Sequence, residues 1–291
     1  MPDIHSPLGL LLDVDGPIAS PVTRTIATPS IVSDLILLAG ANVPIAFITG
    51  RSADFIRDEV IAPLVSAGLP ADLRMYGVCE KGAVWFPISP AGMGEVVIDD
   101  SVALPQAVVD EVRQLVVDRF SDTMFFDATK QAMISVEQRT DVDHATYVAA
   151  QPDFNEAAFA IVTRHGLGVR YGDREHPDAD GSVPFRLDPT IISTDIESVT
   201  LDKDHGARRA LEFFAESGSL PEVWRSVGDS RSDYLMADHL HAAGYDVAHV
   251  DVRPADGILD RPYPVIVMGE QIHDEAGAAF LDYWVEKLQL H

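Results

Sequence analysis

The chain has 291 residues and a formal net charge of −25 at pH 7, from 46 acidic and 21 basic side chains. Its composition, 47% hydrophobic and 23% charged, is typical of a globular protein, and its length suggests about two domains. So acidic a surface argues against nucleic acids and anionic membranes as partners, because both repel negative charge. The single cysteine, Cys79, excludes an internal disulfide and any multi-cysteine metal site.

Two further features concern the cellular location. No apolar run approaches the roughly 18 residues that a membrane-spanning helix needs, so we expect no such span. The first residues, Met1–His5, lack the positive segment and apolar stretch of a signal peptide. Because one unpaired cysteine also fits a reducing compartment, we expect a cytoplasmic protein.

The first part of the chain alternates strands with helices. The predicted elements are, in order, a strand at Leu8–Leu12, a helix at Pro29–Gly40, a strand at Val43–Ile48 and a helix from Ser52 to about Gly68. Both strands are short, continuous apolar runs, which is typical of strands buried on both faces of a parallel sheet. This alternation predicts an α/β arrangement with right-handed crossovers.

The middle of the chain has a different rhythm. It predicts a helix at Leu104–Phe120, a strand pair across Met124–Gln138, a helix at Phe154–His165, strands at Val169–Tyr171 and Phe185–Ser193, and an exposed loop at Tyr171–Gly181. Hairpin-like strands with amphipathic helices indicate an α+β domain.

The α/β rhythm then resumes. The elements expected here are helices at Gly206–Ala215, Ser232–Ala242 and Asp274–Leu288, and strands at Val223–Val227, Val247–Val252 and Val265–Met268. We therefore predict one α/β core built from residues 1–86 and 199–291, with an α+β domain at 87–198 inserted into it.

Carboxylates follow two of the predicted core strands. Asp13 and Asp15 come directly after the first strand, and Asp229 follows the strand at 223–227, with Asp233 about one helical turn further on. Each could be a turn former or a helix cap. Parallel strands bring their carboxyl ends to one sheet edge, however, and clustered carboxylates with open positions for water suit Mg²⁺.

Phosphate-binding groups follow a third strand and precede a helix. Thr49 and Gly50 supply a hydroxyl and an unhindered backbone N–H ahead of a helix N-terminus. Arg51 could bind an anion or lie on the surface. Lys203, just before the helix at 206–215, could neutralise a phosphoryl group or be an ordinary solvated lysine.

These motifs together resemble those of the haloacid dehalogenase (HAD) superfamily. The matching segments are Asp13-Val14-Asp15-Gly16, Ile48-Thr49-Gly50-Arg51, Lys203 in an Asp-Lys-x-x-Gly-Ala-like setting, and Gly228-Asp229-Ser230-x-x-Asp233, in the family's order. The insert and the segment Tyr76–Ala83 resemble the large cap, and the segment leading into it, of the sucrose-phosphatase, trehalose-phosphatase and Cof-type subgroup. Pro17 departs from the family pattern, as does Asp204-His205 ahead of Gly206.

The resemblance implies a Rossmann-like parallel sheet core with an inserted cap, and it implies residue roles. Asp13 would be the nucleophile that forms an aspartyl-phosphate, and Asp15 the general acid and base. Mg²⁺ would be held by Asp13, the backbone carbonyl of Asp15 and Asp229, with Asp233 in support. Thr49, Gly50, Arg51 and Lys203 would bind substrate, and Thr49 and Lys203 would also be catalytic.

The expected function is a Mg²⁺-dependent phosphatase for a small phosphorylated metabolite, such as a sugar phosphate. One alternative is a phosphomannomutase-like phosphomutase, which would pass the phosphoryl group back to a sugar hydroxyl. Another is a non-catalytic binding module, although such a module would have no need of an acid at Asp15. Substrate choice would lie with the cap. Its basic candidates for contact with the substrate are Lys130, Arg139, Arg170 and Arg186, each of which could instead be a plain surface residue.

Overall fold

A computed structural model describes residues 6–290, so the prediction about Met1–His5 concerns residues outside the described part. The chain divides into two compact units. The first combines the residues up to Val97 with those from Asp202 onward, and the second is Ile98–Leu201. Each unit is described by itself.

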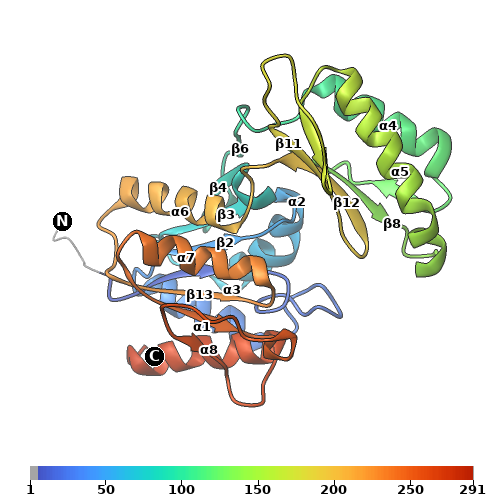
Figure 1. Ribbon diagram of the computed structural model, residues 1–291. Coiled ribbons are helices and arrows are strands. Elements are labelled where there is room, and N and C mark those ends of the chain that lie inside the picture. Colours follow the sequence, from blue (N-terminus) through green and yellow to red (C-terminus); the bar gives the residue numbers. More distant parts are fainter. Residues whose placement is uncertain (1–5, 291) are drawn as a thin grey trace. The chain divides into compact units, whose positions relative to one another are not determined.

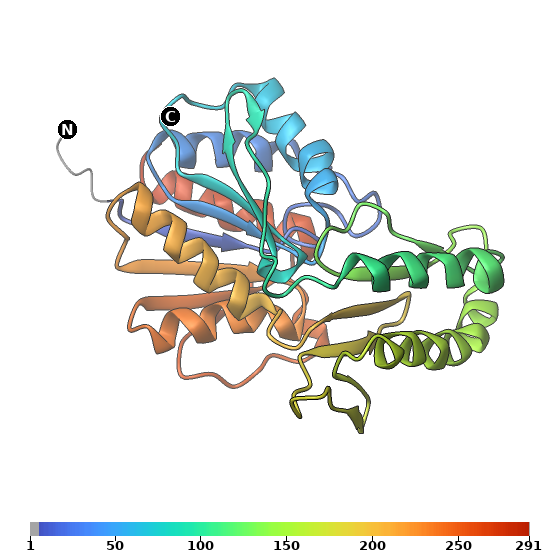
Figure 2. The same ribbon diagram turned by 90° about the horizontal axis from the view of Figure 1, so that it is seen from above.

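The first unit is built on one mixed sheet with the strand order β15-β14-β13-β1-β2-β3-β4-β5, and β6 pairs with β4. Its strands are β1 (Gly9–Leu12), β2 (Ile45–Ile48), β3 (Met75–Cys79), β4 (Val84–Ser89), β5 (Gly92–Met93), β6 (Val97–Ile98), β13 (Val223–Gly228), β14 (Asp246–Asp251) and β15 (Val265–Ile266). From β15 to β3 all neighbours are parallel, whereas β3, β4 and β5 pair antiparallel. Figure 2 shows strands from both ends of the chain side by side in this sheet.

Helices cover both faces of this sheet. They are α1 (Pro29–Gly40), α2 (Ala53–Ile56), α3 (Ala62–Ala67), α6 (Lys203–Ser217), α7 (Tyr234–Ala242) and α8 (His273–Lys287). Figure 1 shows α6 and α7 on one face and α1 and α8 on the other. Every residue of β1 and β2 is buried, which explains why both strands are continuous apolar runs.

The inserted unit contains a second sheet with the order β10-β9-β11-β12-β8-β7. Its elements are α4 (Gln106–Leu115), β7 (Met124–Phe126), β8 (Ile134–Gln138), α5 (His144–Arg164), β9 (Val169–Tyr171), β10 (Arg174–His176), β11 (Phe185–Pro189) and β12 (Ser193–Ser198). Alternate strand residues such as Ile134, Val136 and Ile196 are buried with Val108 and Val112 of α4 and with Phe154 of α5. The unit is therefore α+β, as the sequence predicted.

Three predictions for the insert differ from the structure. The stretch 171–181, predicted as an exposed loop, contains β10, which pairs antiparallel with β9. Helix α5 begins at His144, not Phe154, and contains Pro152. Proline removes the hydrogen bond to the carbonyl of Val148, but Val148 is exposed, so water can replace that bond. The stretch predicted as one strand at 185–193 is a hairpin, in which β11 ends at Pro189 and β12 begins at Ser193.

Residues 87–97, which the sequence analysis placed in the insert, contribute to β4, β5 and β6 of the first sheet. None of the helices within residues 6–290 is both long and apolar enough to cross a membrane.

Candidate active site at the carboxyl edge of the core sheet

Three parallel strands deliver polar residues to the same edge of the core sheet. In the ladder Leu12 of β1 is paired with Phe47 of β2 and with Val227 of β13. The residues that follow these strands, Asp13 and Asp229 among them, therefore meet where parallel strands end. This is the usual place for a ligand site in an open α/β sheet.

Lys203 is the cation at the centre of this edge. It is the first residue of α6, where Asp202 caps the helix by accepting a hydrogen bond from the Lys203 backbone N–H. Its ammonium donates to Asp13 Oδ1 at 2.5 Å and to the Ile48 carbonyl at 2.8 Å, and it pairs with Asp233 Oδ1 at 2.8 Å. The ammonium therefore makes two hydrogen bonds and one ion pair, all with groups of the protein.

Asp233 is fully buried and held on both oxygens. Its Oδ2 accepts hydrogen bonds from the backbone N–H of Asp229 and of Ser230, at 3.0 and 2.8 Å, and from the Ser230 hydroxyl at 2.7 Å. Burial alone would raise the pKa of Asp233, but Lys203 and the hydrogen bonds from Ser230 outweigh it and lower the pKa. Asp233 is therefore anionic and fixes the position of Lys203.

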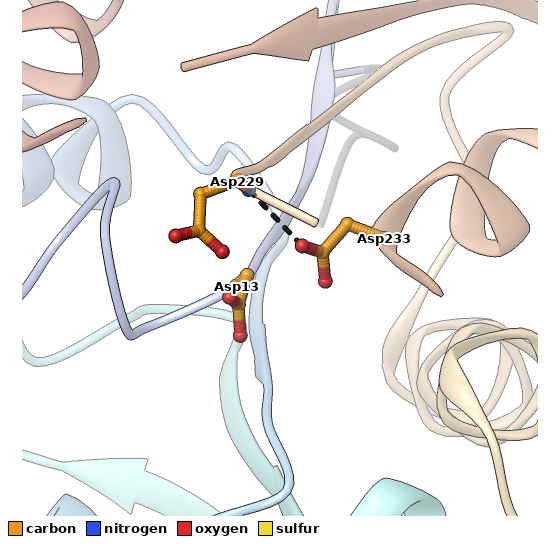
Figure 3. Close-up of side chains that lie close together, drawn as sticks. All are labelled: Asp13, Asp229 and Asp233. Atoms are coloured by element: carbon orange, nitrogen blue, oxygen red, sulfur yellow. Dashed lines mark hydrogen bonds between the residues drawn. The ribbon is translucent and has the colours of Figure 1, made fainter. Parts of the chain in front are cut away.

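The carboxylates of Asp13, Asp229 and Asp233 lie close together (Figure 3), and one oxygen of each lies within 4.8 Å of the others. Burial, and then repulsion from Asp233, raise the pKa of Asp13 well above its ordinary value, although Lys203 opposes the shift. The same two causes raise the pKa of Asp229, against attraction from Arg253 and His273. Negative charge at Asp13 and Asp229 is thus only partly compensated by protein groups.

This oxygen-rich cluster fits a hard divalent cation such as Mg²⁺. A cation would neutralise the remaining charge of Asp13 and Asp229, whereas Asp233 already has Lys203 beside Oδ1 and three hydrogen bonds on Oδ2. Only glycine leaves room for the Asp229 side chain at position 16, because a Cβ on Gly16 would lie 2.9 Å from Asp229 Cγ. Gly16 also has a φ of +98°, which favours glycine.

Asp15 is held by Arg51. The guanidinium donates from Nε to Asp15 Oδ2 and from Nη2 to Asp15 Oδ1, both at 2.9 Å. The two side chains are 35% and 26% exposed, so the pair lies at the surface of the site. The prediction that Arg51 binds substrate stays a prediction; in the structure its guanidinium makes this bidentate contact with Asp15.

Thr49 and Gly50 form the turn that connects β2 to the following helix. Thr49 is buried, and its hydroxyl accepts the backbone N–H of Arg51 at 3.0 Å. Ser52 caps α2, which continues through a π-helical turn at Arg57–Ile61 into α3. The structure therefore brings this turn to the same edge as Asp13.

Three features of this edge were not singled out as functional from the sequence. One is the turn Glu80–Gly82, which packs against the Thr49–Arg51 loop. Another is Arg253, whose Nη1 lies 3.6 Å from Asp229 Oδ2. The third is a cavity of about 460 Å³ lined by Asp229, Ser230, Arg231, Tyr234, Asp251, Arg253, Asp256 and Gly257. Arg253 lies after β14, where the sequence contains no motif. The cavity combines residues of the Gly228–Asp233 motif with residues at and after the end of β14.

The basic candidates of the insert are partly committed to other contacts. Arg186 pairs with the fully buried Glu197 at 2.7 Å and donates to the Leu201 carbonyl at 2.8 Å. Arg139 pairs with Asp141 on an exposed turn. Arg186 therefore stabilises the insert, whereas the Arg139 pair is exposed and contributes little, and Arg170 is exposed on β9.

Sequence comparison identifies no relatives, since neither a protein-family model nor a curated protein sequence matches this chain. Comparison with solved structures finds chains of similar fold. The C-terminal domain of trehalose-6-phosphate phosphatase from C. albicans aligns with a TM-score of 0.60 at 12% identity, over 97% of this chain and 94% of that one. A haloacid dehalogenase-like hydrolase from Bacteroides thetaiotaomicron aligns with a TM-score of 0.58 at 11% identity, over 95% and 98%. Trehalose-6-phosphate phosphatase from Aspergillus fumigatus gives 0.54 at 14%, over 97% and 94%.

The chain therefore has the fold of the haloacid dehalogenase superfamily, a largely parallel α/β core with an inserted α+β cap. This confirms the fold and the resemblance predicted from the four sequence motifs.

Proposed function

We propose that this protein is a Mg²⁺-dependent phosphatase that hydrolyses a small phosphorylated metabolite, a sugar phosphate, through an aspartyl-phosphate on Asp13. The observation that carries the proposal is the buried arrangement of Asp13, Lys203 and Asp233 beside Asp229. Solved structures of the same fold, the two trehalose-6-phosphate phosphatases named above, support the sugar phosphate as the substrate class.

Asp13 is the nucleophile. One of its carboxylate oxygens attacks phosphorus, and the bond from phosphorus to the leaving oxygen breaks as the acyl phosphate forms. Asp13 Oδ1 accepts a hydrogen bond from the Lys203 ammonium, so Oδ2 is the oxygen that attacks phosphorus. Lys203 also compensates part of the charge that gathers around the phosphoryl group.

Asp15 is the general acid and base. It gives its proton to the leaving sugar oxygen, then takes one from the water that attacks the acyl phosphate and releases inorganic phosphate. The Arg51 contact orients Asp15 as a carboxylate, so Asp15 takes up a proton from solvent before it acts as the acid. Orientation of this kind contributes to the rate because little reorganisation remains.

Asp13, Asp229 and the backbone carbonyl of Asp15 would hold Mg²⁺, and Asp233 would support them through its hydrogen bonds with Asp229 and Ser230. When bound, the ion shields the nucleophile from the phosphate dianion and polarises a phosphoryl oxygen. The Thr49 hydroxyl and the Gly50 backbone N–H bind the other phosphoryl oxygens.

A screen of sugar phosphates for inorganic phosphate release tests the proposal. We expect Mg²⁺-dependent release from at least one of them, suppressed by EDTA and restored by Mg²⁺. Asp13→Asn should abolish release, and acid-quenched parent protein should hold one phosphoryl group on the peptide that contains Asp13. A protein that converts a sugar phosphate into its isomer only with a bisphosphate activator would be a phosphomutase. Absence of both reactions would favour a binding module.

A further inference from the structure

The turn that follows β3 has an unusual backbone. Glu80, Lys81 and Gly82 have φ values of +48°, +58° and +103°. Glycine is needed at 82, because a Cβ there would lie 2.5 Å from His205 Cδ2 and 2.9 Å from the Gly206 nitrogen. Glu80 and Lys81, however, are side-chain-bearing residues in the left-handed region, which is a strained conformation.

Hydrogen bonds to the neighbouring loop hold this turn in place. The Lys81 N–H donates to the Thr49 carbonyl at 3.0 Å, and the Glu80 N–H donates to the Arg51 carbonyl at 3.1 Å. The strained backbone is therefore fixed to the loop that carries the proposed phosphate-binding turn. Such strain persists when the surrounding structure imposes it, and it is commonest at functional sites.

The Lys81 side chain runs toward Gly50. Its Cε lies 3.9 Å from the position that a Cβ on Gly50 would occupy, and the ammonium nitrogen is one bond beyond Cε. The side chain is half-buried, so its charge is near the site and still reachable from solvent. The left-handed backbone at 81 thus presents a cation beside the Thr49–Gly50 turn.

Other cations described at this edge already balance carboxylates. Lys203 is shared by Asp13 and Asp233. Arg51 donates two hydrogen bonds to Asp15, and Arg253 lies 3.6 Å from Asp229 Oδ2. A phosphate dianion arriving at the Thr49–Gly50 turn adds two negative charges to an already acidic site. A further cation at this position would compensate one of them.

We propose that Lys81 binds the substrate phosphate at the Thr49–Gly50 turn, as a phosphoryl-binding residue additional to Lys203. The proposal rests on the proposed function for the identity of the anion. It predicts that inorganic phosphate, the expected product, also binds at Lys81. Lys203 then mainly positions Asp13, and Lys81 makes the direct contact with the incoming anion.

Lys81→Asn tests the proposal with little change in backbone strain, because asparagine tolerates the left-handed region and lacks the charge. Lys81→Arg keeps the charge. Arg24→Asn is the matched control, since Arg24 is a cation at a φ of +59° on a separate exposed turn. Binding of inorganic phosphate in the presence of Mg²⁺ is measured by titration calorimetry, with KM, kcat and melting temperature for each variant.

Lys81→Asn should weaken phosphate binding and raise KM on the order of ten- to a hundredfold, with a smaller change in kcat and no loss in melting temperature. Lys81→Arg should restore much of the affinity, and Arg24→Asn should match the parent. Unchanged phosphate affinity in Lys81→Asn would overturn the role of Lys81, as would a parent protein that binds no phosphate. A failure of the proposed function would give a different result: the parent protein would bind inorganic phosphate but would release no phosphate from any substrate.

Discussion

The ammonium of Lys203 lies 2.8 Å from Oδ1 of Asp233, and neither side chain is more than 8% exposed. The same ammonium donates to Asp13, yet the two carboxyl groups respond oppositely to their surroundings. The pKa of Asp233 is lowered, because Lys203 and Ser230 outweigh burial, and the pKa of Asp13 is raised, because burial and repulsion from Asp233 dominate. Ionised Asp233 thus stabilises the folded protein. Ionised Asp13 destabilises it, and its position suits the proposed chemistry.

Asp233→Asn should therefore destabilise the protein strongly. Removing one partner of a buried ion pair typically costs about 3 to 5 kcal/mol of unfolding free energy. A carboxyl whose native pKa is depressed stabilises above its unfolded value and loses that contribution as pH falls through the native value. The loss measured by urea unfolding should therefore be full at pH 7 and shrink below about pH 4. Asp246→Asn, at the exposed pair with Arg225, should change stability by less than about 0.5 kcal/mol.

Asp13→Asn should abolish turnover without a comparable loss of stability. In metal-free protein the raised pKa of Asp13 means that folding disfavours its ionised form, so stability from this group falls as pH rises above the unfolded value. A neutral side chain of the same shape removes that cost. The melting temperature of metal-free Asp13→Asn at pH 7 should equal or exceed that of the parent. A drop as large as that of Asp233→Asn would contradict the opposite roles assigned to the two residues.

The core of the fold, and the meeting of Asp13 with Asp229 and Asp233 at one edge of it, could be predicted from the sequence. The strands before Asp13, Thr49 and Asp229 are short apolar runs that stop abruptly, and parallel pairing then requires their carboxyl ends to meet. Asp229 and Asp233 are also close in the chain, so local helix geometry relates them.

Contacts between distant segments could not be predicted in the same way. The partner of Arg51 depends on where Asp15 points after β1 ends, which no periodicity determines. The approach of Lys81 to Gly50 depends on the pairing of β2 with β3 and on a left-handed turn at two residues that normally avoid it. The predicted helix at 154–165 also missed the first part of α5, which continues through Pro152 because the exposed Val148 leaves its carbonyl accessible to water.

Gly16→Ala should impair metal binding as well as stability. Its Cβ would lie 2.9 Å from Asp229 Cγ, and alanine is strained at a φ of +98°. We expect a loss of about 1 to 3 kcal/mol in unfolding free energy and a higher Mg²⁺ concentration for half-maximal activity. Gly68→Ala is the control, because Gly68 has the same φ and a Cβ there would meet no atom within 4 Å. Gly68→Ala should lose stability and keep the parent's Mg²⁺ dependence; an equal shift in both would mean that strain alone affects the metal site.

Arg51→Lys should lower kcat through the orientation of Asp15. A lysine can reach one carboxylate oxygen but cannot reproduce the two parallel bonds of the guanidinium. We expect a loss in kcat on the order of ten- to a hundredfold with a sugar phosphate, and a smaller loss with an aryl phosphate, whose leaving group needs less protonation. The melting temperature should change little, because the pair is partly exposed. Arg57→Lys, on the exposed surface beside Asp54 and Asp58, should keep the parent's kcat. If both substrates lose rate equally in Arg51→Lys, Arg51 acts on the phosphoryl group rather than through Asp15.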